Sequence, residues 1–414
     1  MLGFGQRSRG NLLGVVDIGT SKIVCLAVEA RWGRRREQDE LVCLGIGHQR
    51  SAGVRGGVVV DPVALEDALR STIAAAERNA RQRFDEVYVS ASCGRLGSRS
   101  FAAHADVATG AVSSADIERL YDGAIAYAER DGRTLLHLNR KAYRLDGAAC
   151  GEDPRGMAAR RVTADLHAVT ADEGPLRNLM HTVERSHLSV RGLVAAPYAA
   201  GLAVTSPEER ELGVTVIDFG GGTTGIAIFA EGHFVHCEVL ATGGHHLTFE
   251  IAKNFQAPLV EAERIKTLYA SMVNAQSDLS DRFSYALAVD ADGAVGEATR
   301  AELSRVVEPR VADLLAMIAA RRSAVGAGAL PVVLTGGGSQ LFGLREYAAS
   351  VLGCEVRSSR TRALPGMPSG SDSPVFAAAV GLAYAAVEGS RVEVADRSRG
   401  GYFAQVRRWL AGGL

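Results

Sequence analysis

Two glycine-rich turns, far apart in the sequence, contain the residue types that bind phosphate groups. Each turn follows a short apolar run and opens with an aspartate, Asp17 in the first turn and Asp218 in the second. Small residues let backbone N–H groups approach a phosphate closely, and hydroxyl groups in both turns add hydrogen-bonding capacity. A single turn of this kind is also typical of an ordinary β-hairpin. Because the pattern occurs twice, we expect the two turns to bind one polyphosphate together.

The other residues of the two turns suggest how charge would be arranged around that polyphosphate. They are Gly19, Thr20, Ser21 and Lys22 in the first turn, and Gly220, Gly221, Gly222, Thr223 and Thr224 in the second. Lys22 adds a positive charge for the phosphates. The carboxylates of Asp17 and Asp218 are expected to hold Mg²⁺ through its water ligands, because Mg²⁺ gives up water reluctantly.

Two further segments are candidates for binding the rest of a nucleotide. The first is a run of small residues after an apolar strand, Gly336, Gly337, Gly338 and Ser339. Consecutive glycines leave room for a base or an α-phosphate, although a flexible loop is the alternative. The second is the pair Glu263 and Lys266, which share one face of an expected helix. They could bind ribose hydroxyls or the base, or they could simply form a solvated ion pair.

Two adjacent histidines, His245 and His246, follow a glycine pair and raise the question of a metal or catalytic site. No third ligand stands at a useful spacing from them. We therefore interpret both as ordinary polar residues close to a nucleotide-binding lobe.

The apolar runs predict the elements that must position these residues. Each turn is expected to join two strands of a hairpin, 12–16 with 23–28 and 214–217 with 226–229. Helical periodicity predicts helices at 62–83, 114–131, 175–186, 263–270, 300–322 and 375–387, the fifth broken near Glu308-Pro309. Residues 277–296 are polar and are expected to form a loop. The repeated strand–Asp–x–Gly–strand unit predicts an α/β protein of two similar lobes.

The composition limits the class of protein. With 414 residues the chain is long enough for two or more domains, and its net charge of −1 gives no basic excess for nucleic-acid binding. The six cysteines have no metal-ligand spacing and are expected to be free thiols in a reducing compartment. No signal peptide and no apolar stretch of about 20 residues is evident, so we expect a cytoplasmic protein with at most peripheral membrane contact.

The C-terminal residues have the pattern of a short amphipathic helix. Its expected apolar face and flanking basic residues are Tyr402, Phe403, Val406, Arg407, Arg408, Trp409 and Leu410. Large aromatic residues beside arginines favour the interface of an anionic bilayer. The alternative is a helix that docks on the protein's own core. The polar, glycine-containing segment 389–401 before it favours a tethered helix.

The order of the four nucleotide-binding elements resembles the actin/Hsp70/sugar-kinase superfamily, and within it the chain resembles the FtsA family of bacterial cell-division proteins. Stretches that carry this resemblance are 15–22, 53–59, 262–269, 306–310 and 332–339. The resemblance extends from about residue 12 to about residue 410. It implies that Gly243 and Gly244 close over the nucleotide phosphates.

The resemblance implies an actin-like two-lobed fold with duplicated ribonuclease-H-like lobes and an FtsA-type 1C insertion. The expected parts are lobe 1A (1–83 and 162–196), subdomain 1C (84–161), lobe 2A (197–243 and 311–388), subdomain 2B (244–310), a linker (389–401) and the membrane-targeting helix (402–414).

It also implies a function: a protein that binds ATP and Mg²⁺, polymerises, and anchors the tubulin-like protein FtsZ to the inner face of the cytoplasmic membrane at the division site. Other division proteins would bind through 1C. We expect Arg300, Arg305 and Arg310 to attract the FtsZ C-terminal tail. No catalytic base can be named from the sequence, and the resemblance implies that hydrolysis is slow or regulatory. The alternatives are a PilM-like pilus-assembly protein and a small-molecule kinase of the same superfamily.

Overall fold

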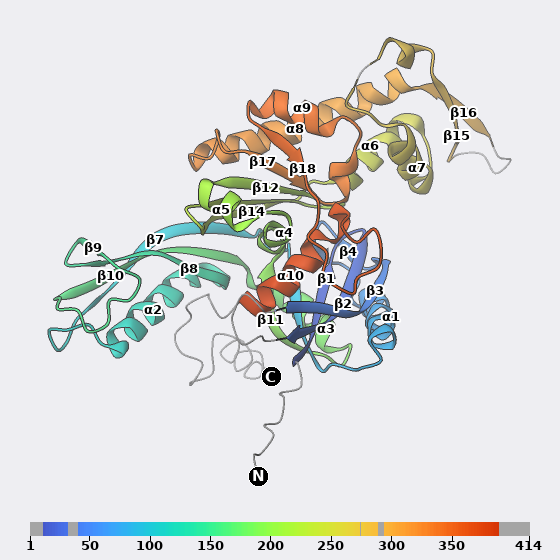
Figure 1. Cartoon of the computed structure of the whole chain (residues 1–414). Helices are drawn as coiled ribbons and strands as arrows, with labels where there is room; N and C mark the ends of the chain where they lie inside the picture. Colours follow the sequence, from blue (N-terminus) through green and yellow to red (C-terminus); the bar gives the residue numbers. More distant parts are fainter. Residues whose placement is uncertain (1–10, 32–39, 274, 289–293, 389–414) are drawn as a thin grey trace.

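The computed structural model describes residues 11–31, 40–273, 275–288 and 294–388, which form two lobes (Figure 1). The sheet of the first lobe contains β1 (Asn11–Ile18), β2 (Lys22–Arg31), β3 (Glu40–Arg50), β6 (Glu86–Ala91) and β11 (Ser189–Ala195). The sheet of the second lobe contains β12 (Val214–Phe219), β13 (Thr224–Ala230), β14 (His233–Leu240), β17 (Val332–Thr335) and β18 (Val356–Ser358). The expected linker and C-terminal helix lie outside the described residues.

The two sheets have the same topology. Their strand orders are β11-β6-β1-β2-β3 and β14-β13-β12-β17-β18. In each sheet three consecutive strands form an antiparallel meander, and the two later strands add in parallel beside the first. The expected duplication is therefore confirmed, and both hairpins lie where the sequence predicts them.

Two helices join the lobes. Helix α4 (Ala196–Val204) packs on β12, β13 and β14, whereas α10 (Ala377–Glu388) packs on β1, β2 and β6 of the first lobe. Residues 377–388 were expected in lobe 2A, and this assignment is wrong. The apolar side chains of α10 are buried in the same core as the first sheet, so the chain crosses back to the lobe in which it began.

A separate sheet forms the inserted subdomain, which projects from one side of the molecule (Figure 1). It has the order β7-β10-β8-β9, made by β7 (Gly97–Asp106), β8 (Arg133–Leu145), β9 (Ala148–Cys150) and β10 (Arg161–Asp172), and it is covered by α2 (Ser114–Ala128). The expected limits of 84 and 161 differ from this arrangement. Strand β6 pairs within the first lobe, and β10 pairs within the insertion, because each completes the core of its own sheet.

The outer part of the second lobe contains α6 (Gly244–Phe255), α7 (Leu259–Tyr269), β15 (Arg282–Ala286), β16 (Val295–Thr299) and α8 (Arg300–Ala324). The loop expected at 277–296 is wrong, because β15 and β16 pair there as a hairpin. The alternation of buried Phe283 and Tyr285 with exposed neighbours is the strand signal, and Phe283 stacks on Tyr269 at 4.5 Å between ring centroids.

The break expected in α8 at Pro309 is also wrong. The helix continues through Pro309, and buried residues on both sides of it, Val307 and Val311, belong to one apolar core. A proline inside a helix removes one hydrogen bond and costs about 3 kcal/mol. Burial of the apolar face of a 25-residue helix offsets that cost.

The remaining elements cover the sheets or edge the cleft between the lobes. They are β4 (Val54–Arg55), β5 (Val58–Val59), α1 (Pro62–Ala80), α3 (Glu173–Glu184), α5 (Pro207–Leu212) and α9 (Leu344–Leu352), with 3₁₀ turns at Arg130–Gly132, Gln276–Leu279, Gly337–Gln340 and Pro374–Phe376. Within the described ranges, every helix is too short or too polar to cross a bilayer.

The close contact between α4 and α10 predicts a strict requirement for glycine at position 381. A Cβ atom there would lie 1.6 Å from the carbonyl oxygen of Ala199, so Gly381→Ala must push the two helices apart. We expect this variant to lower the free energy of unfolding by about 1–3 kcal/mol, measured by urea denaturation.

Gly123→Ala is the matched control, because Gly123 is an exposed helical glycine of α2 with open space around its Cβ position. It should gain about 0.5–1 kcal/mol from the better helix propensity of alanine. Equal urea midpoints for Gly381→Ala and the unsubstituted chain would contradict the packing argument.

Candidate nucleotide-binding site

The two glycine turns have the same local structure. Each connects a central strand to its antiparallel partner, and each is closed by one backbone hydrogen bond. The N–H of Gly19 donates to the carbonyl of Lys22 at 2.9 Å, and the N–H of Gly220 donates to the carbonyl of Thr223 at 2.9 Å. The aspartate of each turn stands two residues before the donor glycine. The sequence repeat is therefore a repeat of backbone geometry.

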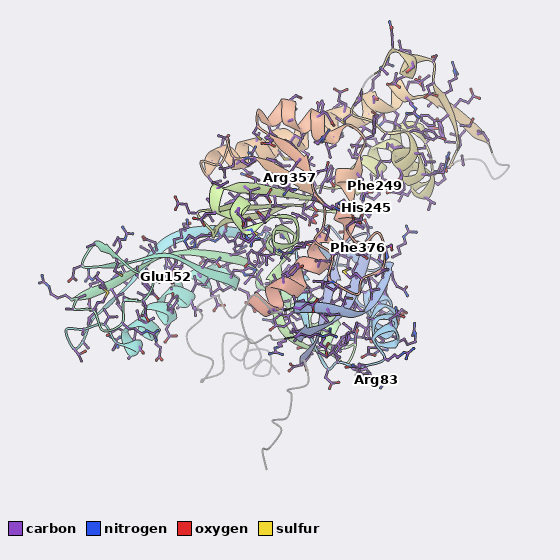
Figure 2. All side chains as sticks on the ribbon, in the orientation of Figure 1. Arg83, Glu152, His245, Phe249, Arg357 and Phe376 are labelled. Atoms are coloured by element: carbon purple, nitrogen blue, oxygen red, sulfur yellow. The ribbon has the colours of Figure 1, made fainter. Side chains whose placement is uncertain are left out.

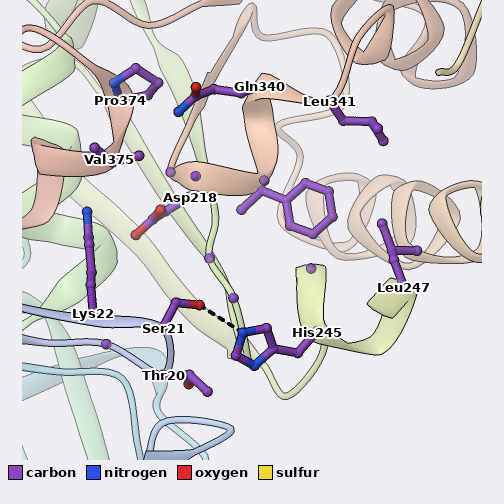
Figure 3. Close-up of a pocket in the computed structure, with 18 of the residues that line it drawn as sticks. Thr20, Ser21, Lys22, Asp218, His245, Leu247, Gln340, Leu341, Pro374 and Val375 are labelled. Atoms are coloured by element: carbon purple, nitrogen blue, oxygen red, sulfur yellow. Dashed lines mark hydrogen bonds between the residues drawn. The ribbon is translucent and has the colours of Figure 1, made fainter. Parts of the chain in front are cut away.

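The turns lie on opposite walls of a cavity of about 630 Å³ between the lobes. Residues from all the predicted segments line it: Asp17, Gly19, Thr20, Ser21, Lys22, Asp218, Gly220, Gly221, Thr223, Gly244, Glu263, Lys266, Gly336, Gly337 and Gly338. Figure 3 shows the side chains of Lys22 and Asp218 pointing into the same space. A cavity of this size can hold a nucleotide.

Four of the expected nucleotide-binding residues do not line the cavity but support its walls. Thr224 donates through Oγ1 to the carbonyl of Thr242 at 2.7 Å, and Ser339 donates through Oγ to the carbonyl of Gly336 at 2.7 Å. Gly222 faces Thr20, and Gly243 packs against the backbone of the second turn. The structure thus separates residues that could touch a ligand from residues that shape the site.

The charged groups at the centre of the site are held away from bulk water. Ser90 Oγ donates to Asp17 Oδ1 at 2.6 Å, yet burial still raises the pKa of Asp17. Burial, and then the nearby charge of Asp17, raises the pKa of Asp218 to about 6. Burial likewise lowers the pKa of Lys22, against the opposing pull of both carboxylates.

Two carboxylates that repel one another, buried Asp17 and half-buried Asp218, favour a bound cation. Lys22 supplies one positive charge, and its Nζ atom also lies 5.2 Å from the ring centroid of Phe376. Oxygen ligands are those that Mg²⁺ prefers, so Asp17 and Asp218 fit a magnesium ion held through water. Such an ion would relieve the repulsion that raises the pKa of Asp218.

Glycine is required where the walls come close together. A Cβ atom on Gly336, which has φ +80°, would lie 2.3 Å from Asp218 Oδ1. A Cβ on Gly222 would lie 2.4 Å from Thr20 Oγ1, and one on Gly221 would lie 2.0 Å from Ser21 Oγ. The lack of a side chain at Gly336 therefore leaves space for the carboxylate of Asp218. At Gly221 and Gly222 it leaves space for the turn of the first lobe.

Glu263 and Lys266 form a small polar network in the cavity wall beside the second turn. Lys266 Nζ lies 2.7 Å from Glu263 Oε2, and it also donates to Thr248 Oγ1 at 3.0 Å and to the carbonyl of Gly244 at 3.2 Å. Thr248 Oγ1 donates to Glu263 Oε2 at 2.5 Å. The pair is thus a fixed part of the cavity wall as well as an ion pair.

Sequence reasoning missed several residues of the cavity, including Ser92, Gln340 and Phe342. The sequence also led us to interpret His245 as an ordinary polar residue. In the structure its ring lines the cavity and contacts Ser21 across the cleft. The glycine pair before His245 was the available signal. Figure 2 shows His245 near the middle of the molecule, where the lobes meet.

The three arginines expected to attract a partner's tail have different surroundings. Arg300 lines the cavity and pairs with Asp281, with 2.7 Å between Nε and Oδ2. Arg310 pairs with Glu250, with 3.0 Å between Nη2 and Oε1. Arg305 is exposed on α8. Arg300 therefore belongs to the cavity wall, because α8 begins at the cleft.

The comparisons with known proteins agree with this architecture. The sequence pattern of the family described as "Cell division protein FtsA" matches residues 215–381, and that of the "SHS2 domain inserted in FTSA" matches residues 94–170. The second match coincides with the inserted sheet. The FtsA cell division protein of Agrobacterium fabrum is 37% identical over 385 residues, which cover 90% of this chain and 86% of that protein.

Solved structures with the same fold include a PilM–PilN type IV pilus biogenesis complex, with a TM-score of 0.65, 18% identity, and coverage of 90% of this chain and 98% of that one. MreB5 of Spiroplasma citri bound to ADP has a TM-score of 0.52 at 13% identity, covering 91% of this chain and 96% of that one. These likenesses show an actin-like fold. With two matched turns facing one cavity, an inserted sheet and a relative 37% identical over most of its length, the chain belongs to the FtsA family of cell-division proteins.

Proposed function

We propose that the chain binds ATP with Mg²⁺ in the cavity between the lobes. The observation that carries this proposal is the facing pair of matched turns, each led by an aspartate and each closed by the same hydrogen bond. Backbone N–H groups and hydroxyls of both turns would hold the phosphates. Magnesium, when bound, would neutralise phosphate charge between Asp17 and Asp218. Glu263, Lys266 and Arg300 would orient the ribose and base.

ATP would act mainly as a conformational ligand, with slow hydrolysis at most. The carboxylates that line the cavity, among the residues the structure describes, are Asp17, Asp218 and Glu263. Glu263 Oε2 is already bonded to Lys266 and Thr248, so it is poorly placed to take a proton from water. Binding to both walls would favour a closed cleft and the lobe contacts that go with it.

The cellular role we propose is to anchor FtsZ to the inner face of the cytoplasmic membrane during division. The family membership supports a role in cell division. The aromatic and basic residues 402–410 would bind anionic lipid, and polymerisation along lobe contacts would strengthen a weak single-helix anchor. The inserted subdomain would recruit other division proteins.

The outer part of the second lobe is where we propose that the FtsZ tail binds. Of the three arginines considered, Arg305 and Arg310 lie exposed on α8, whereas Arg300 faces the cavity. Arg310 shares its charge with Glu250. Arg305 is therefore the better candidate for contact with an acidic tail.

Asp218→Asn tests the nucleotide site through two opposite effects. The pKa of Asp218 is about 6, against an ordinary 3.8, so the folded state favours the neutral carboxyl. The stability contributed by this raised pKa of Asp218 is fully present below pH 4 and is lost as the pH rises through 6. Removing the charge should therefore raise the free energy of unfolding of the nucleotide-free protein by about 1–3 kcal/mol at pH 7. The gain should shrink toward pH 4.

The same variant should lose measurable binding of Mg²⁺–ATP in titration calorimetry, because a carboxylate on the phosphate side of the cavity is gone. Asp67→Asn is the matched control, since Asp67 is exposed on α1 and does not line the cavity. Unchanged affinity for Mg²⁺–ATP in Asp218→Asn would refute the proposed site.

Trp409→Glu tests the membrane anchor. Burying a carboxylate where an indole should lie costs a few kcal/mol, so binding to vesicles that contain anionic lipid should weaken at least tenfold. Trp409→Phe keeps an aromatic ring and should bind nearly as well. The measurement is co-sedimentation with vesicles, with and without FtsZ and ATP. Full co-sedimentation of Trp409→Glu would rule out the anchor.

A further inference from the structure

One side-chain hydrogen bond crosses the cleft beside the two phosphate-binding turns. Ser21 belongs to the turn of the first lobe, and His245 lies in the first turn of α6 in the second lobe. Ser21 Oγ and His245 Nε2 are 3.0 Å apart (Figure 3). Because the partners belong to opposite lobes, separation of the lobes would break this bond.

His245 is held firmly on its own lobe. Its backbone N–H donates to the carbonyl of Gly221 at 2.7 Å, and the N–H of Gly244 donates to the carbonyl of Gly220 at 3.0 Å. Next to it, the N–H of Gly243 donates to His246 Nδ1 at 3.1 Å. The start of α6 is thereby tied to the second turn, and the ring of His245 projects from a fixed base.

The two turns touch one another on either side of this bond. The Cβ position of Gly221 lies 2.0 Å from Ser21 Oγ and 3.4 Å from His245 Nε2, and that of Gly222 lies 2.4 Å from Thr20 Oγ1. Glycine at both positions is therefore needed for the closed arrangement. The contact is made at the polar tips of the turns, away from the apolar helices α4 and α10 that join the lobes.

The charges around His245 come from both lobes. Burial lowers its pKa, followed by the charge of Lys266, while Glu263 opposes this and His246 and Arg50 add to it. The imidazole is accordingly neutral near pH 7. One ring nitrogen is then an acceptor and the other a donor, so it can pair with the Ser21 hydroxyl in either tautomer.

We propose that Ser21 and His245 form a latch that holds the two lobes together over the phosphate-binding turns and slows the release of bound nucleotide. The part concerning nucleotide rests on the function proposed above, whereas the contact between the lobes rests on the Ser21–His245 hydrogen bond alone. Separation of the two lobes at these turns would require this hydrogen bond to break. His245 is thus a positioning residue for the cleft, acting through Ser21.

Hydrogen–deuterium exchange of the nucleotide-free protein tests the closure directly. His245→Ala should speed exchange about two- to tenfold in peptides covering the two turns, the range expected for the loss of one hydrogen bond. His245→Gln, whose amide can still reach the Ser21 hydroxyl, should largely restore protection. His233→Ala is the control, because His233 is exposed on β14 and does not line the cavity. Unchanged exchange in His245→Ala would overturn the latch.

The second measurement is the dissociation rate of fluorescently labelled ADP. His245→Ala should release it about two- to tenfold faster. Ser21→Ala also removes a hydroxyl proposed to hold the phosphates, so it should release labelled ADP at least as fast as His245→Ala, and the double variant should be no faster than Ser21→Ala alone. Additive effects in the double variant would overturn the coupling. If the unsubstituted protein binds no labelled ADP, the proposed nucleotide function fails, and the exchange experiment still decides whether the latch exists.

Discussion

The electrostatic constraint at the centre of this protein is a pair of carboxylates, one buried and one half-buried, that line one cavity together with Lys22. Asp17 and Asp218 are carried by equivalent strands of two separate sheets, so their approach requires the lobes to meet. Burial and mutual repulsion raise the pKa of Asp218 to about 6. The two carboxylates carry more negative charge than one lysine can balance. The site is therefore suited to a cation and, together with that cation, to a phosphate chain.

The rest of the architecture brings those two carboxylates together. In each sheet an aspartate stands one residue before the end of the first strand, and the turn that follows is closed by a backbone hydrogen bond from its glycine. Helices α4 and α10 pass between the sheets and pack so closely that a glycine is needed at 381. Because α10 returns to the first lobe, residues of both lobes share one apolar core around α4 and α10. The cavity lies beside the two polar glycine turns, where the lobes also meet.

The same arrangement explains how a ligand in the cleft could influence distant surfaces. Arg300 begins α8 at the cavity and also pairs with Asp281 near the β15–β16 hairpin. Arg305 and Arg310, further along the same helix, lie on the outer surface. Helix α8 thus runs from the cavity to the surface where we propose that a partner binds, and it would connect the two.

Much of the site is determined by local sequence. Three features were predictable because each depends on residues close together in the chain and on hairpin or helix geometry. They are the Asp-x-Gly turns, the triple glycine, and the pair Glu263 and Lys266. The duplicated fold followed from the repeat of the first of these units. The assignment of the inserted subdomain followed from its likeness to FtsA. Its limits were misplaced by one strand at each end, since pairing partners decide to which sheet β6 and β10 belong.

Tertiary structure alone decided the remainder. The roles of His245 and Arg300 depend on how α6 and α8 are placed against the opposite lobe, and such distances are not encoded in sequence spacing. The continuity of α8 through Pro309 and the β15–β16 hairpin both depend on burial against distant residues, which outweighs local propensity. The return of α10 to the first lobe has the same cause. An alanine-rich helix can pack on either sheet, and here α10 packs on α4 and on β1, β2 and β6 of the first sheet.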